Sequence, residues 1–97
     1  MAQKVVWSKE AEDDLINILI YWNERNKSNA YSLKLFNEFM KIDSMIALFP
    51  NAGKETDFKN VRAFIKDNFS VYYSEQSEHI NILHVWDNRR NPEDFKL

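Results

Sequence analysis

The sequence predicts an α+β domain in which a helical hairpin packs on a mostly antiparallel sheet of about four strands. Two long stretches in the first half carry apolar residues at spacings of three and four, which is typical of amphipathic helices. Three shorter stretches in the second half alternate between apolar and polar residues, which is typical of strands. The single Gly and two Pro argue against an all-β protein with many tight turns.

The first half of the expected order β-α-α-β-β-β begins with a β-branched and aromatic strand over residues 4–7. Ser8 is a good N-cap for a helix over residues 9–24, because its hydroxyl can accept from a free backbone N–H and acidic residues follow it. The apolar positions of this helix are Ala11, Leu15, Ile18, Leu19 and Trp22. Ser28 can cap a second helix, which Pro50 and Gly53 end. The apolar positions of the second helix are Leu35, Phe39, Ile42, Ile46 and Phe49.

The second half is expected to form strands over residues 61–66, 69–74 and 80–86. Asp67-Asn68 predicts a two-residue hairpin turn, since both residue types tolerate the positive φ that such a turn requires. Arg62, Phe64 and Lys66 share one strand face, which we expect to meet solvent or a partner if the helices cover the other face. The polar tail after the last strand, residues 87–97, is expected to be irregular or to form a single helical turn.

Length and composition exclude several classes of protein. Ninety-seven residues are expected to form one domain, residues 1–97, and a hydrophobic content of 44% excludes intrinsic disorder. A net charge of −2 gives no overall basic field to attract nucleic acid. The absence of Cys excludes thiol chemistry and suits a reducing cytoplasm. No apolar run approaches the roughly 20 residues of a membrane span.

Catalytic motifs are scarce. A single Gly cannot make a phosphate-binding loop, and His79 and His84 lack the spacing of a metal site, so we expect no metal and no cofactor. What remains is a group of cationic, aromatic and imidazole side chains: Lys54, Lys59, Arg62, Lys66, Tyr72, His79, His84, Arg89, Arg90 and Phe95. Guanidinium groups match phosphates and carboxylates, so this group can hold nucleic acid or an acidic peptide. Alternatively, these are solvated charges paired with nearby acids, and His84 is a strand histidine beside a polar neighbour rather than a general base.

Five segments stand in an order that carries a resemblance. They are residues 6–15 (strand into acidic helix), residues 46–53 (helix ending in Pro and Gly), Arg62, residues 69–73 (an aromatic strand) and residues 82–92, which end in Arg-Arg-Asn-Pro. Together they resemble the RelE/ParE toxins of bacterial type II toxin–antitoxin systems, also known as plasmid stabilisation proteins. The resemblance covers nearly the whole chain, and it implies a toxin that is silenced by an antitoxin from the same operon.

The family has two branches, one that cleaves mRNA on the ribosome and one that poisons DNA gyrase. Ribonucleolytic relatives use basic residues on two core strands, an Arg after the last strand and a Tyr in the tail. Arg62 and Arg89 match two of these positions, whereas Ser70 and Phe95 stand at the other two. Ser70 cannot neutralise a phosphorane and Phe95 cannot transfer a proton, so the resemblance lies nearer the ParE branch.

The predicted function is therefore a ParE-like inhibitor of DNA gyrase, neutralised by a cognate antitoxin in the cytoplasm. Its predicted partner-binding residues are Arg62, Lys66, Tyr72, Arg89, Arg90 and Phe95. One alternative is a RelE-like, metal-independent endoribonuclease that acts on the ribosome with its mRNA through Arg62, His84 and Arg89, so the question of enzymatic activity stays open. Another is a non-toxic module that only binds an antitoxin. A homodimer is compatible with each alternative.

Overall fold

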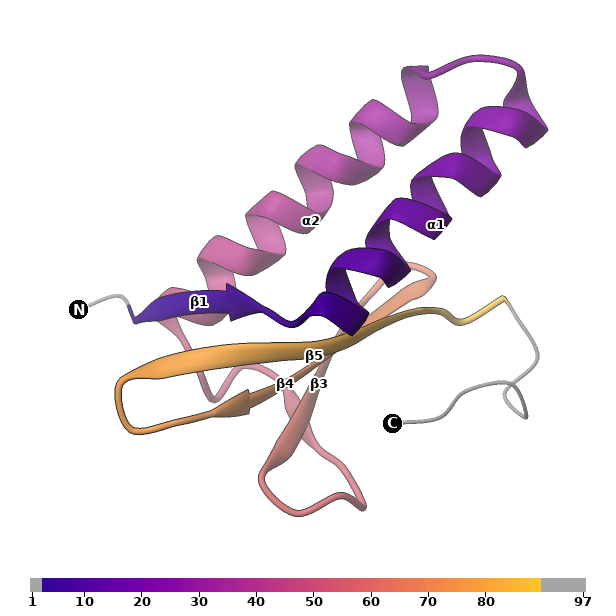
Figure 1. The fold of residues 1–97 in the computed structure, drawn as a ribbon. Helices are drawn as coiled ribbons and strands as arrows, with labels where there is room; N and C mark the ends of the chain where they lie inside the picture. The colour runs from indigo at the N-terminus through magenta and orange to yellow at the C-terminus, as the bar shows by residue number, and fades with distance from the viewer. Residues whose placement is uncertain (1–2, 90–97) are drawn as a thin grey trace.

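The computed structural model describes residues 3–89 of the chain. β1 (Lys4–Trp7) leads into α1 (Lys9–Asn26) and α2 (Ala30–Leu48), which are followed by β2 (Lys54–Glu55), β3 (Val61–Lys66), β4 (Phe69–Glu75) and β5 (His79–Asp87). The strands form one sheet in the order β1-β5-β4-β3-β2, in which β1 runs parallel to β5 and the other neighbours are antiparallel. The two helices lie together over one side of this sheet (Figure 1). The predicted fold class is thus confirmed.

The sheet has five strands, and the additional strand is β2. Its two residues pair with Arg62 and Ala63 of β3, and a strand this short carries no detectable alternation in the sequence. The hairpin turn at residues 67–68 is confirmed, because Lys66 and Phe69 are register partners and Asp67 has a φ of 54°.

The helix boundaries differ slightly from those expected. α1 continues to Asn26 and ends where Lys27 adopts a φ of 53°, a left-handed conformation that stops a helix. Ser28 is not the N-cap residue of α2, since that position belongs to Asn29. The Ser28 hydroxyl accepts a hydrogen bond of 3.2 Å from the backbone N–H of Ala30, so it supports the helix start from one residue further back.

Ser8 joins β1 to α1 as expected of an N-cap. Its hydroxyl accepts from the backbone N–H of Ala11 at 3.0 Å, and its own N–H donates to the carbonyl oxygen of Ile82 at 3.0 Å. The second bond continues the pairing with β5 by one residue after β1 ends at Trp7. The Trp7 indole N–H donates to Asp43 of α2 at 2.8 Å, which ties β1 to the second helix.

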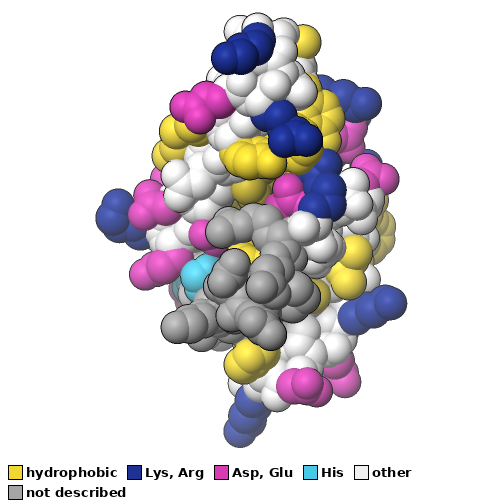
Figure 2. Space-filling view, turned by 90° about the vertical axis from the view of Figure 1, so that its right-hand side faces the viewer, with side chains coloured by type: hydrophobic (Ala, Val, Ile, Leu, Met, Phe, Trp, Pro, Cys, Tyr) yellow, Lys and Arg dark blue, Asp and Glu magenta, His cyan; other side chains and the backbone are white. Residues whose placement is uncertain are grey.

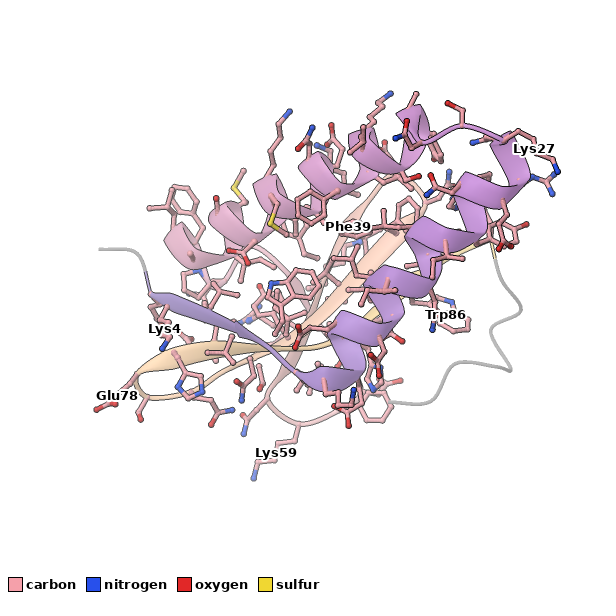
Figure 3. The ribbon with its side chains drawn as sticks, turned by 45° about the horizontal axis from the view of Figure 1, so that its top comes forward. Lys4, Lys27, Phe39, Lys59, Glu78 and Trp86 are labelled. Carbon is pink, nitrogen blue, oxygen red and sulfur yellow. The ribbon has the colours of Figure 1, made fainter. Side chains whose placement is uncertain are left out.

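The core lies between the helices and the sheet. It includes the predicted apolar positions Ala11, Leu15, Ile18, Leu35, Phe39, Ile42 and Ile46, together with Phe69, Val71, Tyr73, Ile80, Ile82 and Val85 of β4 and β5. Phe39 points from α2 toward the sheet (Figure 3), and its ring meets that of Phe69 edge-on at 5.3 Å. Burying one such aromatic side chain contributes about 1.5–3 kcal/mol, so these rings are a main attachment of α2 to the sheet.

The segment after α2 is fastened to the sheet by Tyr73. The hydroxyl of this fully buried side chain donates to the carbonyl oxygen of Pro50 at 2.6 Å and accepts from the backbone N–H of Gly53 at 2.9 Å. A β-carbon on Gly53 would lie 2.7 Å from that hydroxyl oxygen, so this close approach requires glycine. Tyr73 therefore sets the path by which the chain leaves α2 and reaches β2.

The strand face that carries Arg62, Phe64 and Lys66 turns toward the helices, and the expectation that it meets solvent or a partner is wrong. In the β3–β4 register Phe64 lies opposite Val71 and Lys66 lies opposite Phe69, and both partners belong to the buried core. Residues directly opposite each other share a sheet face. Alternation with a period of two shows which residues share a strand face. It does not specify which of the two faces the helices will cover.

A bulge in β5 sets the orientation of its second half. Tyr73 pairs with Ile82 and Tyr72 pairs with His84, so Leu83 is an extra residue on β5. Because of this shift, His84 joins Tyr72 on the sheet face away from the helices, here called the far face. Without the bulge, the strict alternation of a strand would place His84 on the core face with Ile82.

Candidate interaction surface

Arg62 lies at the β2 edge of the sheet, with its side chain 30% exposed. Its Nη1 donates to the carbonyl oxygen of Gly53 at 2.9 Å, and its Nη2 lies 3.7 Å from Glu55 Oε1. The carboxylate is well exposed, so this ion pair is weak on its own. Arg62 therefore holds the short strand β2 and the preceding segment against β3.

Arg89 follows β5, and its guanidinium group contacts both a carboxylate and two aromatic rings. Nε and Nη2 donate to the two carboxylate oxygens of Asp87 at 2.8 and 2.9 Å, and Asp87 is buried. The guanidinium carbon lies 4.2 Å from the centre of the Trp22 ring and 5.2 Å from that of Phe69. The hydrogen bond that Arg89 donates to the Asp87 carboxylate raises the pKa of Arg89 above its usual value. The group is a bidentate ion pair stacked on aromatic rings.

Lys66 connects β3 to α2. Its Nζ donates to Glu38 Oε2 at 2.7 Å. This hydrogen bond lowers the pKa of the Glu38 carboxyl and raises the pKa of the Lys66 ammonium. Both side chains are partly exposed, so solvent screens much of their attraction.

His84 is held by α1. Its Nδ1 lies 3.0 Å from Asp14 Oδ2, and the same oxygen accepts from the backbone N–H of Val85 at 3.0 Å. β1 ends before it reaches this part of β5, and Asp14 satisfies a backbone donor at the edge that β1 leaves open. The contact fits a strand histidine held by polar neighbours, with Tyr72 opposite it across the sheet.

The three residues of the nuclease alternative do not converge. Arg62 lies opposite Tyr73 at one end of β4, whereas the Arg89 guanidinium lies against Phe69 at the other end. Four residues along a strand span about 13 Å. His84 is on the far face of the sheet, while Arg62 is on the face turned to the helices.

Other predicted positions are placed as follows. Ser70, which the resemblance places at a position that is basic in nucleolytic relatives, is buried, and its hydroxyl donates to Asn88 Oδ1 at 3.0 Å. Tyr72 lies on the far face beside His84. Arg90 and Phe95 lie outside the described residues.

Sequence reasoning missed the partners of Arg89. Asp87 stands two residues before it, directly at the end of the strand, and that Asp-x-Arg spacing is a signal that could have indicated the pair. Trp22 gives no such signal, because it belongs to α1 and its helical spacing predicts only a core position. Trp22 does pack against the core, but it is only partly buried, and its ring also lies against the Arg89 guanidinium.

The two helices also expose apolar side chains away from the sheet. Ile16 and Ile20 of α1 are 52% and 47% exposed, and Leu33 and Phe36 of α2 are 58% and 42% exposed. Residues spaced by three or four share a helix face, and the two helices are neighbours. We call these four residues the outer hairpin face. Exposed apolar side chains that share a helix face are candidates for contact with a partner.

Two further properties limit the chemistry of residues 3–89. They contain no group of three or more His, Cys, Asp or Glu side chains arranged to hold a metal ion. Neither α1 nor α2 combines the length and the apolar character that crossing a membrane requires.

The fold and these surfaces define a small α+β protein with a helical hairpin on a five-stranded sheet, and comparisons with known proteins specify its class. A family model described as "ParE toxin of type II toxin-antitoxin system, parDE" matches residues 5–92. The chain therefore belongs to the ParE toxin family, and the resemblance seen in the sequence is confirmed.

One similar solved structure is described as "Chromosomal ParDE TA system from P. aeruginosa". It aligns with a TM-score of 0.75 over 87% of this chain and 94% of that chain, at 19% sequence identity. At this identity the likeness shows a shared fold and nothing more. No protein of curated function matches the chain significantly.

Proposed function

We propose that the protein is a toxin that inhibits DNA gyrase through a protein–protein contact, and that a cognate antitoxin neutralises it. Membership of the ParE family supports the class of activity. One structural observation carries the mechanism: Arg62, His84 and Arg89 lie in three different surroundings, each bonded to a carbonyl or carboxylate of its own chain. Cleaving RNA requires cationic and proton-transferring groups gathered around one phosphate, whereas inhibition by contact does not.

The outer hairpin face supports the antitoxin half of the proposal. Its four apolar side chains suit the apolar side of an amphipathic segment from a partner. The residues predicted from the sequence to contact partners, namely Arg62, Lys66, Tyr72, Arg89, Arg90 and Phe95, stay predictions, and so does a homodimer. Both proposed partners act in the cytoplasm, so the proposal includes that location.

The test of the mechanism uses the purified protein with DNA gyrase and relaxed plasmid. We expect inhibition of supercoiling and accumulation of cleaved DNA trapped on the enzyme. In parallel, the protein is induced in growing bacteria, and primer extension is run on abundant transcripts. Cuts within codons together with unimpaired gyrase would replace this proposal with the ribosome-dependent nuclease. Normal growth at high expression would favour a module that only binds an antitoxin.

The antitoxin surface is tested with the double variant Ile20→Asn/Leu33→Asn. Both side chains are about half exposed, so the fold should tolerate the change. We expect the variant to stay toxic but to escape neutralisation by the co-expressed antitoxin. Phe58→Asn makes a comparable change at a 49% exposed apolar side chain on the β2–β3 loop and should be neutralised normally. Equal neutralisation of both variants would exclude the outer hairpin face.

A further inference from the structure

A pocket of about 640 Å³ opens between α1 and the end of β5. Ile18, Tyr21, Trp22 and Arg25 of α1 line it on one side, and Asp87 and Arg89 line it on the other. Figure 2 views the molecule from the side on which α1 ends and shows cationic side chains next to hydrophobic ones in the upper half of that face. The volume lies within the roughly 300–1,000 Å³ range of ligand pockets.

The charges of the pocket do not balance. Arg89 is neutralised by Asp87, but Arg25 has no acidic partner within residues 3–89. The Arg25 guanidinium carbon lies 5.9 Å from the centre of the Trp22 ring, against which Arg89 also stacks. Two guanidinium groups and one carboxylate leave a single positive charge beside an apolar lining.

We propose that this pocket receives a carboxylate side chain carried on an apolar segment of a partner protein, as in a peptide with Glu next to Leu. The planar Arg25 guanidinium, whose donors have no acceptor among residues 3–89, suits a carboxylate, and the rings of Tyr21 and Trp22 with Ile18 suit the neighbouring aliphatic group. A free phosphate or a phosphodiester has no aliphatic group beside its charge, so it would leave the apolar lining formed by Ile18, Tyr21 and Trp22 without a partner. The proposal does not depend on the identity of the toxin's target.

The test follows the indole N–H signals of the isotopically labelled protein by NMR. The Trp22 indole N–H has no hydrogen-bond partner within the described residues, whereas that of Trp7 is bonded to Asp43, so Trp22 is the reporter and Trp7 an internal reference. The probe is the blocked dipeptide acetyl-Leu-Glu-methylamide. We expect saturable shifts of the Trp22 signal and of amides near Arg25, and an unchanged Trp7 signal.

Three comparisons make the test specific. Acetyl-Leu-Gln-methylamide lacks the charge and inorganic phosphate lacks the apolar group, so each should bind at least fivefold more weakly than the Glu dipeptide. Arg25→Gln should weaken binding of the Glu dipeptide about tenfold. Lys34→Gln removes the same charge from an exposed position of α2 that does not line the pocket, and it should leave binding unchanged.

The absence of saturable shifts would overturn the proposal. Equal binding of the Glu and Gln dipeptides would show that the charge is not recognised. If inorganic phosphate bound as tightly as the Glu dipeptide, the apolar residues of the pocket would contribute nothing to recognition. Equal losses in Arg25→Gln and Lys34→Gln would show attraction to overall charge only. The ligand comparisons use the unaltered protein, so they decide the matter even if a variant folds poorly.

Discussion

Removing one hydroxyl group, in Tyr73→Phe, should destabilise the protein strongly. The ring stays in place, so the hydrophobic contacts of this fully buried side chain are kept. What is lost is the pair of hydrogen bonds to Pro50 and Gly53, of 2.6 and 2.9 Å. The substitution therefore isolates the polar fastening between the sheet and the segment that follows α2.

The magnitude follows from the two groups left without a partner. A buried donor or acceptor that loses its hydrogen bond costs about 1–3 kcal/mol. The carbonyl oxygen of Pro50 can turn partly toward water, whereas the N–H of Gly53 is buried, so we expect a total loss of about 2–3 kcal/mol. For a domain of this size such a loss lowers the melting temperature by about 10–20 °C.

The assay is thermal and urea unfolding followed by circular dichroism, with Tyr21→Phe as the matched control. Tyr21 is 52% exposed, so deleting its hydroxyl should change stability by less than about 0.5 kcal/mol. Burial raises the pKa of the Tyr73 phenol, so the folded protein binds this proton more tightly than the unfolded chain does. The stability of the wild type should therefore fall as the pH rises above the ordinary tyrosine pKa. The Phe variant should lose this part of the alkaline decline. Equal stability of the two variants would refute this account of Tyr73.

Three further substitutions test other contacts. Gly53→Ala places a β-carbon 2.7 Å from the Tyr73 hydroxyl, so it should cost about 1–3 kcal/mol in urea unfolding, and wild-type stability would contradict the close approach. Asp87→Asn removes the charge that neutralises Arg89, so it should lower the free energy of unfolding by about 2 kcal/mol. This loss should become smaller as salt is added, whereas a purely steric effect would not depend on salt. Glu38 has a lowered pKa through its lysine partner on β3, so its contribution is present above the usual glutamate pKa and is lost as the pH falls through the lowered value. Glu38→Gln should therefore make acid unfolding less steep, and an unchanged profile would show that the pair contributes nothing.

The cationic side chains on the sheet show what residue type alone predicts. The guanidinium and ammonium groups of Arg62, Lys66 and Arg89 suit a polyanion or an acidic partner. Each is now seen to bind an acid of its own chain, namely Glu55, Glu38 or Asp87. For Lys66 the reason is the direction of its sheet face, which turns to the helices and brings the ammonium group within reach of Glu38 on α2.

The sequence by itself determines the local secondary structure, because caps, helix periods and turns depend on residues only a few positions apart. The Ser8 cap, the apolar periods of the helices and the hairpin turn after Lys66 all follow from such short-range interactions. Family membership was readable for the same reason, since the order of these local segments carries the resemblance.

Tertiary structure alone decided which way those segments face. The side of β3 that meets the helices, the bulge that turns His84 to the far face and the stacking of Arg89 on Trp22 join residues distant in the chain. Periodicity assigns residues to a common face, but the choice of face depends on how all the layers pack together. A pocket with an unbalanced positive charge therefore became visible only once α1 lay beside the end of β5.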